Sequence, residues 1–159
     1  MARLSGLAIE VDLPIGWDGR IYRPQPAEVQ ASAANQSAST HAVLHAASFP
    51  LPTDRGDYGS GAVDIMGRED VLVTLVEHGP ASAGSALFAS AGPPRGLSPG
   101  DFSPDALQRA IRGQAGTQVF FTVNDRAFCL YVVLGSHEER NRLVPIVNSV
   151  LQSLRLGAG

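Results

Sequence analysis

The side chains best suited to bind or act on a small molecule lie in one glycine-rich stretch, residues 54–61. They are Asp54, Asp57, Tyr58 and Ser60. Carboxylates, phenols and hydroxyls are typical of the few polar groups that orient a ligand in an otherwise apolar pocket. Ser60 is flanked by Gly59 and Gly61, but the Gly-x-Ser-x-Gly elbow of serine hydrolases is incomplete. The stretch therefore favours a flexible binding loop over a serine nucleophile.

The other reactive residues form no catalytic or metal-binding pattern. His41 and His45 are expected on one strand, where four residues at about 3.3 Å each place them about 13 Å apart. His137 begins a zinc-protease-like pattern, but the second ligand position is Asn141. Cys129 lies in an apolar run, where a thiol is buried and inert. We therefore expect no catalytic residue, no metal and no cofactor, and hence no enzyme.

The charged residues also exclude several function classes. All twelve basic residues are arginine, so the chain lacks the lysine that P-loops and Schiff-base enzymes require. The formal net charge is -3, whereas nucleic-acid binders carry a basic surface. The composition therefore predicts no nucleic-acid partner.

Length and hydropathy predict one folded domain over residues 1–159, since the chain is 44% hydrophobic and of ordinary domain size. No stretch approaches about 18 uninterrupted apolar residues, so no membrane partner is expected. The start of the chain has no signal-peptide pattern, and the single cysteine cannot form an internal disulfide. These features predict a cytoplasmic protein.

A β-hairpin is predicted near the N-terminus. Apolar and polar residues alternate over residues 7–13, Pro14 and Gly16 favour a turn, and residues 18–23 are expected to return as the second strand. Aromatic and arginine side chains are enriched at interaction hot spots, so we expect this hairpin to carry an interaction surface. Its candidate residues are Trp17, Arg20, Tyr22 and Arg23.

The middle of the chain alternates strands with long polar connections. Residues 24–41, rich in Ala, Ser and Gln, are expected to form a mobile loop because they have little to bury. A strand at 43–49 and one helical turn within 61–68 follow. Residues 71–77 are apolar on both faces, which predicts a central strand. The Gly- and Pro-rich connection at 79–103 is expected to contain one short edge strand.

The C-terminal third contains two predicted helices and the clearest hairpin. Ser103, Pro104 and Gly113 are start and stop signals for a helix over 104–112. Runs at 119–123 and 127–134 predict a hairpin that turns at Asn124 and Asp125. A terminal amphipathic helix is expected over 145–153, preceded by a capping box at Ser136 and Glu139.

These elements predict an α+β domain, a mostly antiparallel β-sheet packed with helices in a layered α/β sandwich. Residues 7–17, LAIEVDLPIGW, resemble the first hairpin of the PsbP and Mog1-like superfamily, which includes LpqN-like proteins. Residues 149–156, SVLQSLRL, resemble its terminal helix, and the arginine-only composition resembles that of small actinobacterial proteins. The resemblance implies an antiparallel sheet between helical layers and a non-catalytic binding or assembly factor.

Two functional hypotheses remain open. The leading one is a non-catalytic protein-interaction or assembly factor that binds a protein partner or forms a homo-oligomer; it predicts an exposed apolar patch of several hundred Å². The alternative is a small-molecule-binding protein or enzyme with its site in the loops around 54–61. It predicts a cavity that contains at least two side chains of Asp54, Asp57, Tyr58 and Ser60.

Overall fold

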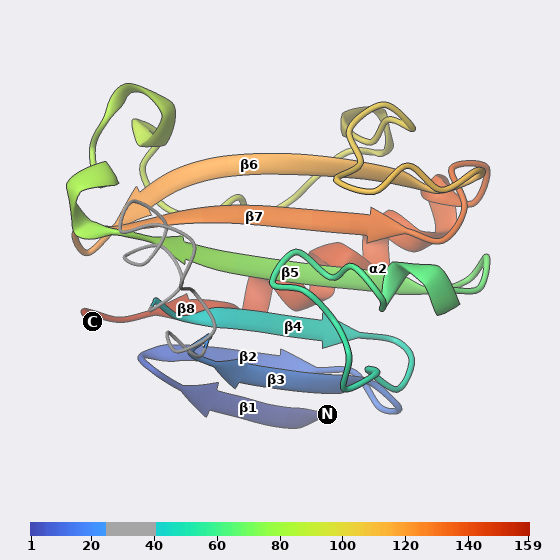
Figure 1. The fold of residues 1–159 in the computed structure, drawn as a ribbon, viewed down its shortest axis with the longest axis horizontal. Coiled ribbons are helices and arrows are strands. Elements are labelled where there is room, and N and C mark those ends of the chain that lie inside the picture. The colour runs from blue at the N-terminus through green and yellow to red at the C-terminus, as the bar shows by residue number, and fades with distance from the viewer. Residues whose placement is uncertain (25–40) are drawn as a thin grey trace.

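The computed structural model describes residues 1–24 and 41–159, and residues 25–40 of the predicted mobile loop at 24–41 lie outside them (Figure 1). A five-stranded antiparallel sheet forms the centre of the fold. In spatial order its strands are β3 (Asp18–Tyr22), β4 (Val43–Ala47), β5 (Val71–His78), β7 (Arg126–Leu134) and β6 (Ala115–Val123). A smaller antiparallel sheet contains β1 (Ala2–Gly6), β2 (Ile9–Leu13) and β8 (Arg155–Leu156).

The predicted central strand at 71–77 is confirmed as β5. β5 and β7 pair along their whole lengths and occupy inner positions of the large sheet, as expected of strands that are apolar on both faces. β6 and β7 form the predicted hairpin, and its turn residues Asn124 and Asp125 have φ values of 51° and 59°. Asn and Asp tolerate this left-handed conformation, which two-residue hairpin turns require.

One face of the large sheet carries the main core. Helix α2 (Arg140–Ser153) and strand β2 cover this face, and apolar side chains of β5 and β7 meet them there. Figure 1 shows α2 behind the sheet. The α+β class and the mostly antiparallel sheet are therefore confirmed, although α2 is the only α-helix in the described residues.

Loops, and no second helical layer, cover the opposite face in the described part of the chain. Residues 49–66 and 107–111 pack over β5 and β7 and enclose a second, smaller core. Its members are Ala47, Phe49, Ala62, Val63, Leu72, Tyr131 and Val133, with Leu51, Tyr58, Met66, Leu107 and Ile111 at the margin. This second core positions the residues of the candidate site.

Helix α2 begins at Arg140, so the predicted start at Pro145 is wrong. Pro145 lies inside the helix, where it removes the hydrogen bond to the Asn141 carbonyl. Both residues are exposed, so water can satisfy that carbonyl, and the buried face of α2 keeps the helix in place. No helix in the described part of the chain is long and apolar enough to cross a membrane.

The predicted capping box is also wrong, since no side chain caps the N-terminus of α2. The Glu139 carboxylate instead accepts a hydrogen bond from Arg142 Nε at 2.9 Å.

The predicted N-terminal hairpin is wrong in its pairing. Leu7 and Ala8 have φ values of 51° and 59°, so they form a tight turn that pairs β2 with β1. β8 occupies the other side of β2, and β3 therefore joins the large sheet beside β4. Strand β1 was missed because it has only one large apolar residue, Leu4, and so gives no alternating pattern.

The predicted helix over 104–112 is absent, because the segment runs in turns across the second face of the sheet. The connection over 79–103 contains three single-turn 3₁₀ helices and no edge strand. They are η4 (Pro80–Ser82), η5 (Ala86–Phe88) and η6 (Pro99–Asp101). The helical turn expected within 61–68 is present as η3 (Val63–Ile65).

Candidate functional site

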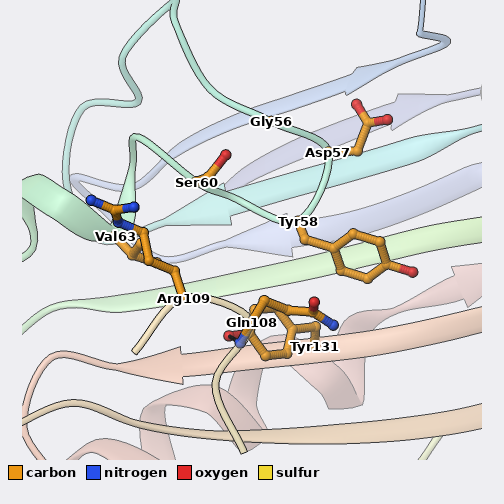
Figure 2. A pocket seen from close by; sticks show the side chains of 8 residues that line it. All are labelled: Gly56, Asp57, Tyr58, Ser60, Val63, Gln108, Arg109 and Tyr131. Carbon is orange, nitrogen blue, oxygen red and sulfur yellow. Dashed lines mark hydrogen bonds between the residues drawn. The ribbon is translucent and has the colours of Figure 1, made fainter. Parts of the chain in front are cut away.

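A cavity of about 390 Å³ lies over β7 on the loop-covered face of the large sheet (Figure 2). Loop 56–60 forms one wall, and Gln108 and Arg109 form the other. The structure thus brings together Asp57, Tyr58 and Ser60 of the candidate residues, while Asp54 does not line this cavity. The lining residues are Gly56, Asp57, Tyr58, Ser60, Val63, Gln108, Arg109 and Tyr131.

Glycine residues shape the loop that forms the first wall. The Gly56 amide donates to the Ser60 carbonyl at 3.0 Å, and the Gly59 amide donates to the Gly56 carbonyl at 2.9 Å. Gly61 has φ of +90°, and a Cβ there would collide with the Asp54 carbonyl oxygen. Only glycine fits this close backbone approach, which turns the chain back and presents Tyr58 and Ser60 to the cavity.

A buried histidine fastens the loop to the sheet. His45, in β4, accepts a hydrogen bond at Nδ1 from Arg55 Nε at 2.7 Å. Its Nε2 lies 2.7 Å from the Asp57 carbonyl oxygen, which can only accept. Because an arginine N–H can only donate, the imidazole must be neutral with its proton on Nε2. Burial is the main cause that lowers the pKa of His45 to about 4.

A second contact holds Asp57 from strand β3. The Tyr22 hydroxyl donates to Asp57 Oδ1 at 2.9 Å, and the Arg55 guanidinium lies 5.8 Å from the centre of the Tyr22 ring. Burial raises the pKa of Tyr22, and the Asp57 charge raises it further. The phenol is therefore a permanent donor that fixes the Asp57 carboxylate.

Two tyrosine rings form the apolar floor of the cavity. Tyr58 and Tyr131 have ring centres 6.1 Å apart in an edge-to-face arrangement. Figure 2 shows Gln108 beside the Tyr131 ring. The Tyr58 hydroxyl lies 3.2 Å from His78 Nε2. Burial raises the pKa of the neighbouring Cys129 thiol to about 11, so it is protonated at neutral pH.

The four candidate interaction residues have different surroundings, and their role in an interaction surface stays a prediction. Trp17 is half-buried against the main core, and Arg20 pairs with Asp18 at 2.6 Å. Tyr22 is used in the contact with Asp57. Arg23 lines a separate cavity of about 520 Å³. The structure therefore assigns Tyr22 to the support of the loop site.

Comparisons with known proteins give no match. No protein-family model fits the chain, and no curated protein or solved structure is significantly similar to it. The resemblance to the PsbP and Mog1-like superfamily stays a prediction, and the function has to be argued from the site itself.

Sequence reasoning missed half of the cavity. Tyr131 lies in the most apolar strand and gave no sign of a polar role, although its phenol is the one hydroxyl in that run. Gln108 and Arg109 were expected on a helix, which would have placed them elsewhere. No group of three or more His, Cys, Asp and Glu residues within 1–24 and 41–159 lies close enough to hold a metal ion.

Proposed function

We propose that this protein is a non-catalytic binding protein and that the cavity between loop 56–60 and Gln108 and Arg109 is its ligand site. The strongest support is that side chains from separate parts of the chain line the same cavity. Asp57, Tyr58 and Ser60 from the loop meet Tyr131 of β7 in one cavity of about 390 Å³. That volume lies within the range of small-molecule sites.

The lining suggests the class of ligand. The partly exposed ring of Tyr58 offers apolar contact area above the buried Tyr131, whereas Ser60, Gln108 and Arg109 supply hydrogen-bonding groups. We propose a small molecule with a flat apolar body and polar groups on one side.

The chemistry of the lining favours binding over catalysis. Among the described residues that line the cavity there is no histidine to act as a base toward the Ser60 hydroxyl. The Asp57 carboxylate is held by the Tyr22 hydroxyl. A nucleophile and a base within hydrogen-bond reach are the usual requirement for covalent catalysis, and the described lining offers no such pair.

A titration followed by NMR tests the proposal. Nucleosides, monosaccharides and aromatic amino acids are added to ¹⁵N-labelled protein, and we expect shift changes concentrated at residues 56–60 and 108–109. Gln108→Ala should weaken binding about threefold to tenfold, because a polar contact is lost. Gln152→Ala, an exposed glutamine on α2, is the matched control and should bind as the wild type does. Scattered shifts, or equal binding by both variants, would overturn the assignment.

A second candidate function is a protein contact through the turn between β2 and β3. Ile15 at this turn is 91% exposed and lies two residues from Trp17. A partner or a second copy that covers this side chain would remove its apolar surface from water, which is favourable. This observation supports the proposal of an interaction or assembly factor.

Light scattering tests this second candidate. We expect the wild type to form a dimer or larger species and Ile15→Ser to shift it toward the monomer. Leu87→Ser replaces another exposed apolar residue, 61% exposed in η5, and should leave the assembly unchanged. A monomeric wild type, or equal effects of the two substitutions, removes the self-association form of this candidate.

A further inference from the structure

We infer that residues 103–113 form a displaceable strap over the cavity, held across the sheet by Tyr131 and coiling into a short helix when released. The inference rests on the proposed function, because the strap supplies Gln108 and Arg109 to the cavity wall. It concerns how access to that site is controlled.

Both ends of the strap already have the geometry of helix termini. The Asp105 amide donates to Ser103 Oγ at 3.1 Å, and the Ala106 amide donates to the Ser103 carbonyl at 3.2 Å. Gly113 has φ of +92°, the left-handed conformation that ends many helices. The residues between are mostly Ala, Leu, Gln and Arg, all good helix formers. Local preference thus favours a helix that the folded protein does not contain.

Tyr131 competes directly with that helix. In a helix the Gln108 amide would donate to the Pro104 carbonyl, four residues earlier. Here it donates to the Tyr131 hydroxyl at 2.6 Å. Leu107 and Ile111 pack on the second core, which adds apolar contact to this anchor. The sheet therefore takes one backbone donor in the middle of the strap away from the helical pattern.

Strand β6 is shaped to receive the strap. Ser103 and Gly116 exchange two backbone hydrogen bonds, each 3.0 Å long, at the outer side of β6. A Cβ at Gly116 would lie 2.8 Å from the Ala106 carbonyl oxygen and 2.9 Å from Leu107 Cδ2. The missing side chain lets the strap lie flat on the strand. The Ser103 end is therefore a hinge, and the docking of residues 106–107 depends on glycine.

The remaining attachments are weak enough to be released. Arg109 pairs with Asp64 at 2.7 Å, but these side chains are 57% and 41% exposed, and such pairs contribute little. A nine-residue helix is also only marginally stable in water. Two forms of similar free energy are the condition for a local unit that opens without global unfolding. A ligand that contacts Gln108 in the docked form raises the population of that form.

Hydrogen exchange of the full-length protein without ligand tests the strap. Tyr131→Phe removes the hydroxyl that accepts the Gln108 amide at 2.6 Å, so we expect the Gln108 amide to exchange about tenfold faster. Amides of β5 and β7 should keep their wild-type rates, and ¹³Cα shifts of the strap should move toward helical values. Gly116→Ala is less specific, because its Cβ would lie 2.8 Å from the Ala106 carbonyl oxygen and also 3.2 Å from the Val132 carbonyl oxygen of β7. Tyr131→Phe therefore carries the test.

Tyr58→Phe is the matched control. It removes a tyrosine hydroxyl from the same cavity, and in the described structure that hydroxyl contacts His78 and makes no hydrogen bond to the strap. It should leave strap exchange unchanged. The inference is overturned if, in Tyr131→Phe, the Gln108 amide exchanges at the wild-type rate, exchanges faster only together with the amides of β7, or the strap ¹³Cα shifts do not move toward helical values. Because no ligand is used, a rigid strap and a failed ligand titration are separate results.

Discussion

Arg126→Ala is expected to lower the free energy of unfolding by about 3 to 5 kcal/mol, the cost of breaking a buried ion pair by removing one partner. Arg126 in β7 and Glu77 in β5 are 6% and 14% exposed, and both Glu77 oxygens accept arginine hydrogen bonds at 3.0 Å. Removal of Arg126 leaves the Glu77 carboxylate buried without its counter-charge.

The same guanidinium ties both ends of the chain to the sheet. It donates to the carbonyls of Leu7, Ala8 and Gly157, which belong to the β1–β2 turn and the segment after β8. In the variant the Leu7 and Gly157 carbonyls lose the arginine donor, while the Ala8 carbonyl still accepts the Gly157 amide at 2.9 Å. The substitution therefore weakens the small sheet as well as the β5–β7 pair.

Urea denaturation at pH 7 measures this effect. Arg3→Ala removes an arginine from the exposed contact with Asp12, 3.0 Å long, and should change stability by no more than about 1 kcal/mol. A loss below about 1 kcal/mol for Arg126→Ala would show that water reaches Glu77 easily and that the pair is not a major support.

When the pH falls from 7 to 4, the free energy of unfolding of His45→Gln is expected to decrease by about 3 kcal/mol less than that of the wild type. Burial lowers the pKa of the folded His45 to about 4 from an ordinary value of 6.5. The unfolded chain therefore binds the proton first, and stability falls as the pH drops from 6.5 toward 4. A difference of about 2.5 pKa units corresponds to about 3 kcal/mol.

The geometry explains why protonation is unfavourable. A proton on Nδ1 would face the Arg55 N–H that now donates to it at 2.7 Å. The groups around the His45 imidazole are the Arg55 guanidinium, the Asp57 carboxylate and the Tyr22 ring. The centre of the Tyr22 ring lies 5.5 Å from that of the imidazole. Glutamine keeps an acceptor for Arg55 and a donor for the Asp57 carbonyl but does not titrate.

Urea titrations at several pH values between 7 and 4 compare the variants. The wild type should lose stability as the pH falls, and His45→Gln should lose less between pH 6.5 and 4. Identical pH profiles for the wild type and His45→Gln would contradict a neutral, buried His45.

Periodicity and turn chemistry were sufficient to predict the strongest strands. β5 is apolar on both faces, which predicted its central position, and the long apolar run of β7 predicted a strand. Asn124 and Asp125 carried the conformational preference that their turn requires, and the loop candidates Asp57, Tyr58 and Ser60 proved to line one cavity. These features depend on residues that are close in the sequence.

The pairing of β1, the path of segment 104–112 and the assembly of the cavity depend on contacts between residues far apart in the sequence. The partner of β2 depends on the Leu7–Ala8 turn, whose residues have no special preference for positive φ, so the sequence could not reveal β1. Segment 104–112 has a helical pattern, yet contacts with Tyr131 and Gly116, more than twenty and about ten residues away, override it. Tyr131, Gln108 and the loop become one site only when the sheet brings them together, because tertiary packing can outweigh the small free-energy differences of local propensity.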